Sequence, residues 1–173
     1  AIREKTIDSN PVLTDAFEYA NKNSKNLHFI GLVSDGGVHS HIDHLKRLCE
    51  LAKENNVKNA FIHAFTDGRD TDPQSGIRYI SDLEKHLEKL RKDNPAFNCR
   101  IATIVGRYYA MDRDKRWERV KLAYDLLVKG IGRSAVYPHD AIQLSYNEGT
   151  TDEFIKPVVL LDESGKPLST IKE

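Results

Sequence analysis

Apolar positions along the chain alternate between the continuous runs typical of buried strands and the three-to-four-residue spacing typical of helices. Continuous apolar runs predict strands over residues 27–33, 60–65 and 99–105. Helical spacing predicts helices over about residues 11–20, 41–54, 73–91 and 117–129, the last ending at Gly130. A unit of strand, loop and helix therefore occurs three times.

The pattern weakens toward the C-terminus. A shorter helix is expected near residues 141–146 and a strand near residues 155–161. Asp162-Glu163-Ser164-Gly165 is typical of a hairpin turn, here leading into residues 168–171. We expect one α/β domain with three α/β/α layers, a mainly parallel but mixed sheet, and an antiparallel C-terminal tail.

Composition narrows the classes of function. Lys and Arg together number 26, as do Asp and Glu, so no global positive field favours nucleic acid or a membrane surface. Cys49 and Cys99 lie far apart in sequence without a C-x-x-C motif, which favours a reducing compartment. The apolar runs are too short to span a bilayer. We expect a monomeric cytoplasmic protein.

The loop after the first strand carries the first candidate chemistry. It reads Ser34-Asp35-Gly36-Gly37-Val38-His39-Ser40-His41. Paired glycines let the backbone approach a ligand, and Ser40 with Asp43 is expected to form a capping box at the next helix. A helix N-terminus preceded by glycines is a common anion site.

Two further loops follow predicted strands, and all three are expected at the same sheet edge, where parallel sheets bind ligands. Together they would bring into proximity Asp35, His39, Asp67, Arg69, Asp70, Arg107 and Arg113. Arginines bind phosphate or carboxylate through paired charge-assisted hydrogen bonds, so this set suits a small anion carrying several charges.

Simpler interpretations exist for the same residues. Arg69 could pair with Asp67 or Asp70, and Arg113 with a neighbouring aspartate, as rim salt bridges of little energetic weight. Tyr108 and Tyr109 are expected to be packing residues and not ligands, Trp117 to be a core residue, and His63 to be a hydrogen-bonded core histidine. Three loops that leave the same sheet edge, two of them with arginines and the first with His39, favour the anion site.

A metal site is the alternative chemistry. His39, His41 and His44 lie close together in sequence and could form the centre of a self-contained metal-dependent hydrolase. The nearby arginines would repel a cation, which argues against it. A third hypothesis is an anion-binding module with a regulatory or assembly role.

The three loops closely resemble the signature segments of cofactor-independent (2,3-bisphosphoglycerate-independent) phosphoglycerate mutases. The resemblance covers essentially the whole chain, and its motifs occupy residues 34–41, 67–70 and 106–114. It implies that residues 1–173 form a substrate-binding, or phosphotransferase, domain inserted into a metal-dependent, alkaline-phosphatase-like domain of a longer glycolytic isomerase.

The resemblance also implies roles for individual residues. The family's contacts to 2- and 3-phosphoglycerate fall on His39, Arg69, Asp70, Arg107 and Arg113, and Asp70 matches the general acid/base. In the family, a serine of the other domain carries the phosphoryl group, supported by two manganese ions (Mn²⁺). Neither that serine nor the metal ligands belong to this chain, so we expect no metal here and no activity from the chain alone.

Overall fold

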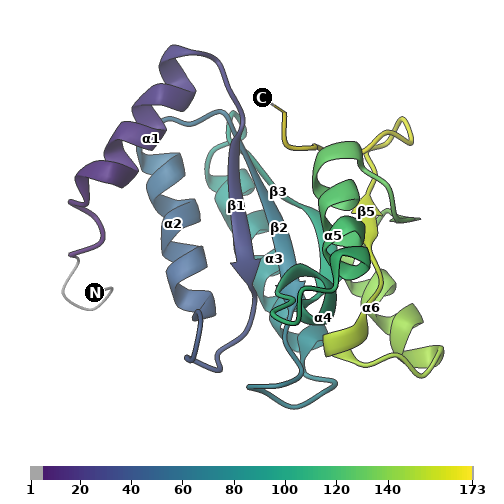
Figure 1. Ribbon diagram of the computed structural model, residues 1–173. Helices are drawn as coiled ribbons and strands as arrows, with labels where there is room; N and C mark the ends of the chain where they lie inside the picture. Colours follow the sequence, from purple (N-terminus) through teal and green to yellow (C-terminus); the bar gives the residue numbers. More distant parts are fainter. Residues whose placement is uncertain (1–5, 173) are drawn as a thin grey trace.

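The computed structural model describes residues 6–172, with helices and strands alternating along the chain (Figure 1). The helices are α1 (Pro11–Lys22), α2 (Ile42–Glu54), α3 (Gly76–Asp93), α4 (Arg107–Ala110), α5 (Trp117–Lys129), α6 (Pro138–Asn147) and the 3₁₀ turn η1 (Asp152–Phe154). The strands are β1 (Leu27–Leu32), β2 (Asn59–Thr66), β3 (Asn98–Gly106), β4 (Arg133–Ala135) and β5 (Val158–Leu160).

Within the described residues the strands form one mixed sheet in the order β1-β2-β3-β5-β4. β1, β2 and β3 are parallel, β5 is antiparallel to β3, and β4 is parallel to β5. The predicted α/β class with a mainly parallel sheet is confirmed. Because β5 runs against β3, the segment before β5 arrives at the edge where β1, β2 and β3 end.

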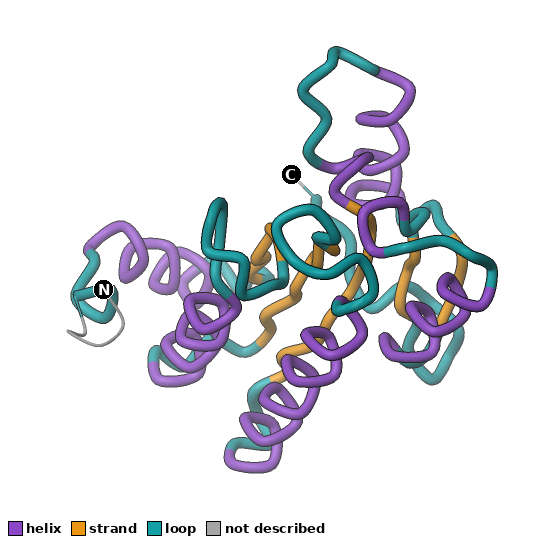
Figure 2. The backbone as a smooth tube through the Cα atoms, turned by 90° about the horizontal axis from the view of Figure 1, so that it is seen from below, coloured by secondary structure: helices purple, strands orange, loops and turns teal. Residues whose placement is uncertain are grey.

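Helices cover both faces of the sheet. Buried side chains of α1, α2, α3 and α6 form one core with one face, and α4 and α5 contribute to a smaller cluster on the other. Figure 2, which looks at the sheet from below, separates these two helical layers. The fold therefore has the three layers predicted from the sequence.

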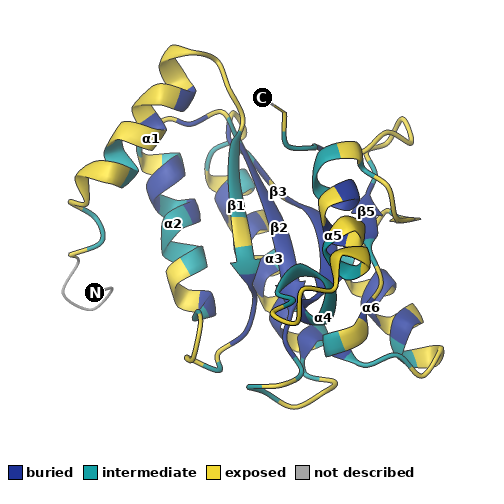
Figure 3. Cartoon of the chain, viewed as in Figure 1, coloured by how far each residue is buried: buried dark blue, intermediate teal, exposed yellow. Residues whose placement is uncertain are grey.

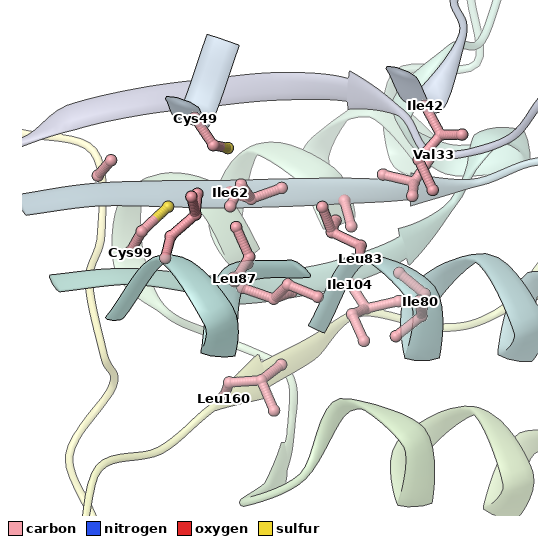
Figure 4. Packing of buried hydrophobic residues seen from close by; sticks show 14 of the residues in the cluster. Val33, Ile42, Cys49, Ile62, Ile80, Leu83, Leu87, Cys99, Ile104 and Leu160 are labelled. Carbon is pink, nitrogen blue, oxygen red and sulfur yellow. The ribbon is translucent and has the colours of Figure 1, made fainter. Parts of the chain in front are cut away.

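The main core lies between the sheet and the larger helical layer. β2 is buried along nearly its whole length, as expected for a central parallel strand (Figure 3). Figure 4 shows side chains from α3, such as Leu83 and Leu87, packed against Ile62 and Ile104 of the sheet. Leu160 of β5 belongs to the same cluster, so the tail shares the core of the parallel strands.

The helix ends follow local sequence signals in two cases. Asn10 caps α1, because its side-chain oxygen accepts a hydrogen bond from Val12 N at 3.0 Å. Gly130 ends α5 in the left-handed conformation with φ +66°, and its N–H donates to the Leu126 carbonyl at 3.0 Å.

Two expected helix starts are wrong. The predicted Ser40–Asp43 capping box does not form: Ser40 Oγ donates to the Leu32 carbonyl at 2.8 Å, and His41 caps α2 by accepting from Asp43 N at 3.2 Å. α3 begins at Gly76 instead of Pro73, because Asp72 first forms a turn, in which its side chain accepts from Gln74 N at 2.9 Å.

Other sequence expectations also need correction. Trp117 is 71% exposed and not a core residue, since it begins α5 while the buried side of that helix is formed by Ala123 and Leu126. Residues 133–135 form β4, which the sequence pattern did not predict. The tail turn is present, with an antiparallel bridge between Leu161 and Pro167, but residues 168–171 form no strand.

Candidate active site

The loop after β1 is held against the loop after β2. Ser34 is buried, and its hydroxyl donates to Asp67 Oδ2 at 2.7 Å. A Cβ at Gly36 would lie 2.9 Å from Asp70 Cβ, so only glycine lets the two loops approach this closely. Gly37 turns the chain with φ +74° and thereby brings His39 back toward the same edge.

His39 and Asp70 face one another across these two loops. His39 Nε2 lies 4.0 Å from Asp70 Oδ2, and half of the His39 side chain is exposed. The exposed imidazole and the partly buried carboxylate are therefore both within reach of a ligand at this edge. Such a pair can bind an anion and exchange a proton with its hydroxyl groups.

The loop after β3 contributes Arg107, the first residue of the short helix α4. Arg107 is buried, and its Nη1 donates to Asp67 Oδ1 and to Asp70 Oδ2, each at 2.7 Å. Burial by itself raises the pKa of Asp67, but hydrogen bonds from Ser34, the backbone and Arg107 outweigh it and hold that pKa below its ordinary value. Asp67 is therefore a carboxylate at neutral pH.

The cavity at this edge has a volume of about 590 Å³. All five residues predicted to bind substrate line it, namely His39, Arg69, Asp70, Arg107 and Arg113. Figure 1 shows why: the loops after β1, β2 and β3 all emerge at the lower edge of the sheet, beside α4. The loops therefore converge as expected, but Asp35 does not line the cavity, because its carboxylate turns to α3 and accepts a hydrogen bond from the Tyr79 hydroxyl.

One wall of the cavity comes from η1, which sequence reasoning missed. Glu153 and Phe154 line the cavity; Glu153 Oε1 lies 3.6 Å from Arg69 Nη1, and the Phe154 ring packs at 5.1 Å from the ring of Tyr108. A Cβ at Gly106 would collide with the Glu153 carbonyl, so η1 lies directly against the end of β3. A Cβ at Gly68 would likewise lie 2.8 Å from Glu153 N, so glycines at or just after two strand ends are the sequence signal for this contact.

A buried carboxylate anchors η1. Asp152 Oδ2 accepts a hydrogen bond from Gly76 N at 2.7 Å, Oδ1 accepts one from the Tyr146 hydroxyl, and the Asp152 carbonyl accepts one from Thr66 Oγ1 at 2.7 Å. Burial raises the pKa of Asp152 despite these donors. Asp152 thereby joins α3, α6 and the end of β2 behind the cavity.

Comparison with known proteins identifies the family. Residues 1–173 match the family model described as BPG-independent PGAM N-terminus. The chain belongs to this family. It is 55% identical over its whole length to the 2,3-bisphosphoglycerate-independent phosphoglycerate mutase of Flavobacterium johnsoniae, and 56% identical over 99% of its length to that of Bacteroides fragilis.

A solved structure shares the fold. A crystal structure of Leishmania mexicana phosphoglycerate mutase, determined at low cobalt concentration, superposes with a TM-score of 0.82 and 30% identity over 93% of this chain. The chain spans about a third of the length of these mutases: 33% of the Flavobacterium protein, 32% of the Bacteroides protein and 33% of the Leishmania chain.

In this member of the BPG-independent PGAM N-terminal family, most of the cavity's cations have a carboxylate partner. Arg69 pairs with Glu153, not with Asp67 or Asp70 as the rim-pair interpretation required, and Arg119 pairs with Asp112 at 3.2 Å. Arg113 is exposed and forms no ion pair with any residue from 6 to 172. Arg113 is thus the lining arginine most readily available to an incoming anion.

The histidine cluster does not favour the metallohydrolase alternative. The rings of His41 and His44 are 6.1 Å apart, His41 is used as the α2 cap, and the only acidic ion-pair partner of His39 in the described chain is Asp70. Within residues 6–172 no group of three or more His, Cys, Asp or Glu side chains could hold a metal ion.

Among the helices of residues 6–172, none has the length and apolar character that a membrane-spanning helix needs.

The expectation for His63 is confirmed, and the two tyrosines expected to be packing residues do contact each other. His63 is fully buried, with Nδ1 2.8 Å from Thr103 Oγ1 and Nε2 2.9 Å from His28 Nδ1, so it is a hydrogen-bonded core residue. Tyr108 and Tyr109 pack edge to face, with their ring centroids 5.2 Å apart. The Arg119 guanidinium carbon lies over the Tyr108 ring, 3.8 Å from the ring centroid. Tyr108 also forms part of the cavity wall.

Proposed function

We propose that this chain is the substrate-binding part of a 2,3-bisphosphoglycerate-independent phosphoglycerate mutase, which interconverts 3-phosphoglycerate and 2-phosphoglycerate. The observation that carries the proposal is the cavity of about 590 Å³ in which four arginines and a histidine meet Asp70, in a chain that matches the family over residues 1–173. A phosphoglycerate carries a phosphate and a carboxylate, and both are suited to guanidinium recognition.

Each side chain has a distinct role in this proposal. Arg113 and Arg69, both exposed in the cavity, bind the ligand's charged groups, while Arg107 binds from the cavity floor. Asp70 exchanges a proton with the glycerate hydroxyls, and His39 lies beside that carboxylate, with Nε2 4.0 Å from Asp70 Oδ2. A firm hold on the carboxylate of glycerate keeps both hydroxyls near the same base while the phosphoryl group changes position.

We place the remaining chemistry outside this chain, within a longer polypeptide into which residues 1–173 are inserted as one domain. A second, metal-binding domain supplies the serine that carries the phosphoryl group and binds two manganese ions. On this proposal the chain alone is inactive as a mutase, with or without added Mn²⁺. A turnover that disappears with Asp70→Asn would overturn that statement.

Titration of 3-phosphoglycerate into the ¹⁵N-labelled chain tests the proposal. With one side of the site missing, we expect a dissociation constant of about 1 mM, or roughly −4 kcal/mol. Binding should weaken steeply with salt, and the shifted amides should lie in the loops after β1, β2 and β3. Arg113→Ala should weaken binding at least fivefold.

The matched control is Arg133→Ala. Arg133 lies in β4, outside the residues that line the cavity, and pairs with Glu148 at 2.9 Å. Its loss removes the same charge and should change the dissociation constant less than twofold. Amide shifts elsewhere on the sheet, or equal effects of Arg113→Ala and Arg133→Ala, would contradict the proposed site.

A further inference from the structure

Asp67 is the point at which the three loops of the cavity meet. It is 2% exposed and does not line the cavity, yet it lies between residues that do. Its Oδ2 accepts a hydrogen bond from the Ser34 hydroxyl in the loop after β1. Its Oδ1 accepts one from Arg107 Nη1 in the loop after β3. One buried carboxylate therefore ties together segments that follow three different strands.

Asp67 Oδ1 also fixes the shape of the loop that carries Asp70, the proposed base. Asp67 Oδ1 accepts the backbone N–H of Arg69 at 3.2 Å and that of Asp70 at 3.1 Å. These bonds fix the backbone from which the Asp70 side chain projects. Arg107 Nη1 then joins Asp67 to Asp70 directly, so both the backbone and the side chain of Asp70 are oriented by Asp67.

We propose that Asp67 is a positioning residue for the mutase reaction: it holds Arg107 and Asp70 in one fixed arrangement on the cavity floor, without touching the substrate. This inference rests on the proposed function. A buried carboxylate that accepts several hydrogen bonds is held in one position. That matters for the rate, because a displacement of about 1 Å in a reacting group can cost a hundredfold in rate. Asp67 acts on the side chain of Asp70 through Arg107, because within the described residues that guanidinium is the only side chain hydrogen-bonded to both carboxylates.

Substitution of Asp67 by Asn separates charge from shape. The Asn oxygen can still accept the two backbone N–H groups, and its amide can donate to Ser34, but the ion pair with Arg107 is lost. Loss of a negative charge favours anion binding, whereas loss of alignment opposes it. The two effects act in opposite directions on KM, while only the second acts on the chemical step.

The kinetic test uses the longer mutase polypeptide of which we propose this chain to be a part. We expect Asp67→Asn to lower kcat at least thirtyfold and to change KM less than threefold. In the background of Arg107→Met, which leaves no side-chain donor to either carboxylate, Asp67→Asn should lower kcat by less than threefold more. A kcat for Asp67→Asn within threefold of wild type, or an equal loss in both backgrounds, would overturn the proposal.

Two further variants guard against a change of fold. Ser34→Ala removes a single hydrogen bond to Asp67 and leaves its charge, so kcat should fall three- to tenfold. Glu163→Gln removes one charge in the exposed tail turn and should leave kcat and KM unchanged. A thermal midpoint for Asp67→Asn more than 10 °C below wild type would shift the decision to Ser34→Ala; an unchanged kcat in that variant then overturns the proposal.

NMR of the Arg107 guanidinium tests the proposal without a measurement of catalysis. In the ¹⁵N-labelled chain, the Arg107 guanidinium should give separate Nη signals, because Nη1 is held by two carboxylates. Asp67→Asn should merge them into one averaged signal. A wild-type mutase polypeptide without activity would overturn the proposed function only; unchanged Arg107 signals in Asp67→Asn would overturn the positioning role, whatever the activity.

Discussion

The carboxylate of Asp70 is expected to oppose the binding of the anion on which it acts. Asp70 Oδ2 accepts a hydrogen bond from Arg107 Nη1 at 2.7 Å, and the Asp70 carboxylate adds a negative charge to the cavity. Asp70→Asn should therefore tighten 3-phosphoglycerate binding to the chain up to threefold, and in the longer mutase polypeptide it should abolish turnover. Calorimetric titration measures the first effect, and weaker binding by Asp70→Asn would contradict the assignment of Asp70 as base.

His63 is expected to make the stability of the chain depend on pH. Burial, and to a smaller extent the charge of the neighbouring His28, lowers the pKa of His63 to about 4. A histidine in the unfolded chain has a pKa near 6.5. Stability is therefore fully present above pH 6.5 and is lost as the pH falls toward 4. The loss from His63 alone should be roughly 3 kcal/mol.

Urea unfolding at pH 7 and pH 4.5 measures that loss. His63→Gln should be less stable at pH 7, but should lose less stability between the two pH values. His139→Gln, at a half-exposed position on α6, is the matched control and should lose as much as wild type. An identical loss in wild type and His63→Gln would show that another group is responsible.

At the scale of single residues, the sequence predicted the position of five side chains that line the cavity. His39, Arg69, Asp70, Arg107 and Arg113 follow strand ends, and parallel strands bring their carboxyl ends together. The position of Trp117 was not predictable in this way. Helical spacing does not tell which turns of a helix are buried, and Trp117 lies in the first turn of α5, where its side chain is exposed.

Among the elements, η1 is held by hydrogen bonds between Asp152 and distant parts of the chain, and the Tyr146 hydroxyl donates one of them. Tyr146→Phe removes the hydroxyl that donates to Asp152 and leaves a buried carboxylate oxygen without that donor. We expect a loss of about 1–3 kcal/mol in the free energy of unfolding, measured with urea. Amide signals of Glu153 and Phe154 should shift as well, because η1 loses its anchor.

Tyr137→Phe is the control for that variant. Tyr137 is 65% exposed at the start of α6, so loss of its hydroxyl should change stability by less than about 0.5 kcal/mol. Equal losses for Tyr137→Phe and Tyr146→Phe would mean that the Asp152 contact does not stabilise η1.

The elements that the sequence did not predict are short and held by distant partners. β4 has three residues, of which Arg133 and Ser134 are exposed, so no apolar alternation marks it. It exists because it pairs with β5. η1 and α4 are likewise single turns, and η1 is positioned by Asp152 contacts to residues far away in the sequence. Local patterns carry no signal for such contacts.

For the whole molecule, one shared core predicts one unfolding transition. Phe17 of α1, Ile62 of β2, Ile142 of α6 and Leu160 of β5 belong to the same buried cluster. Ile142→Ala should cost about 2–5 kcal/mol and should lower the urea midpoints of amide signals from the parallel strands and the tail equally. Leu144→Ala, on the same helix but 45% exposed, should cost far less. Earlier loss of the β4 and β5 signals would reveal two separate units.

The reversed direction of β5 has a consequence for the order in which the site is completed during synthesis. Thr66 and Asp152, whose hydrogen bond seats η1, are 86 residues apart in the sequence. A nascent chain therefore presents the loops after β1 and β2 outside the ribosome before the wall that faces them has been translated. Until then Gly106 and Arg69 lack the neighbours they have in the complete fold. A ligand that requires this wall stabilises only the finished chain, and gives no assistance to the earlier intermediates.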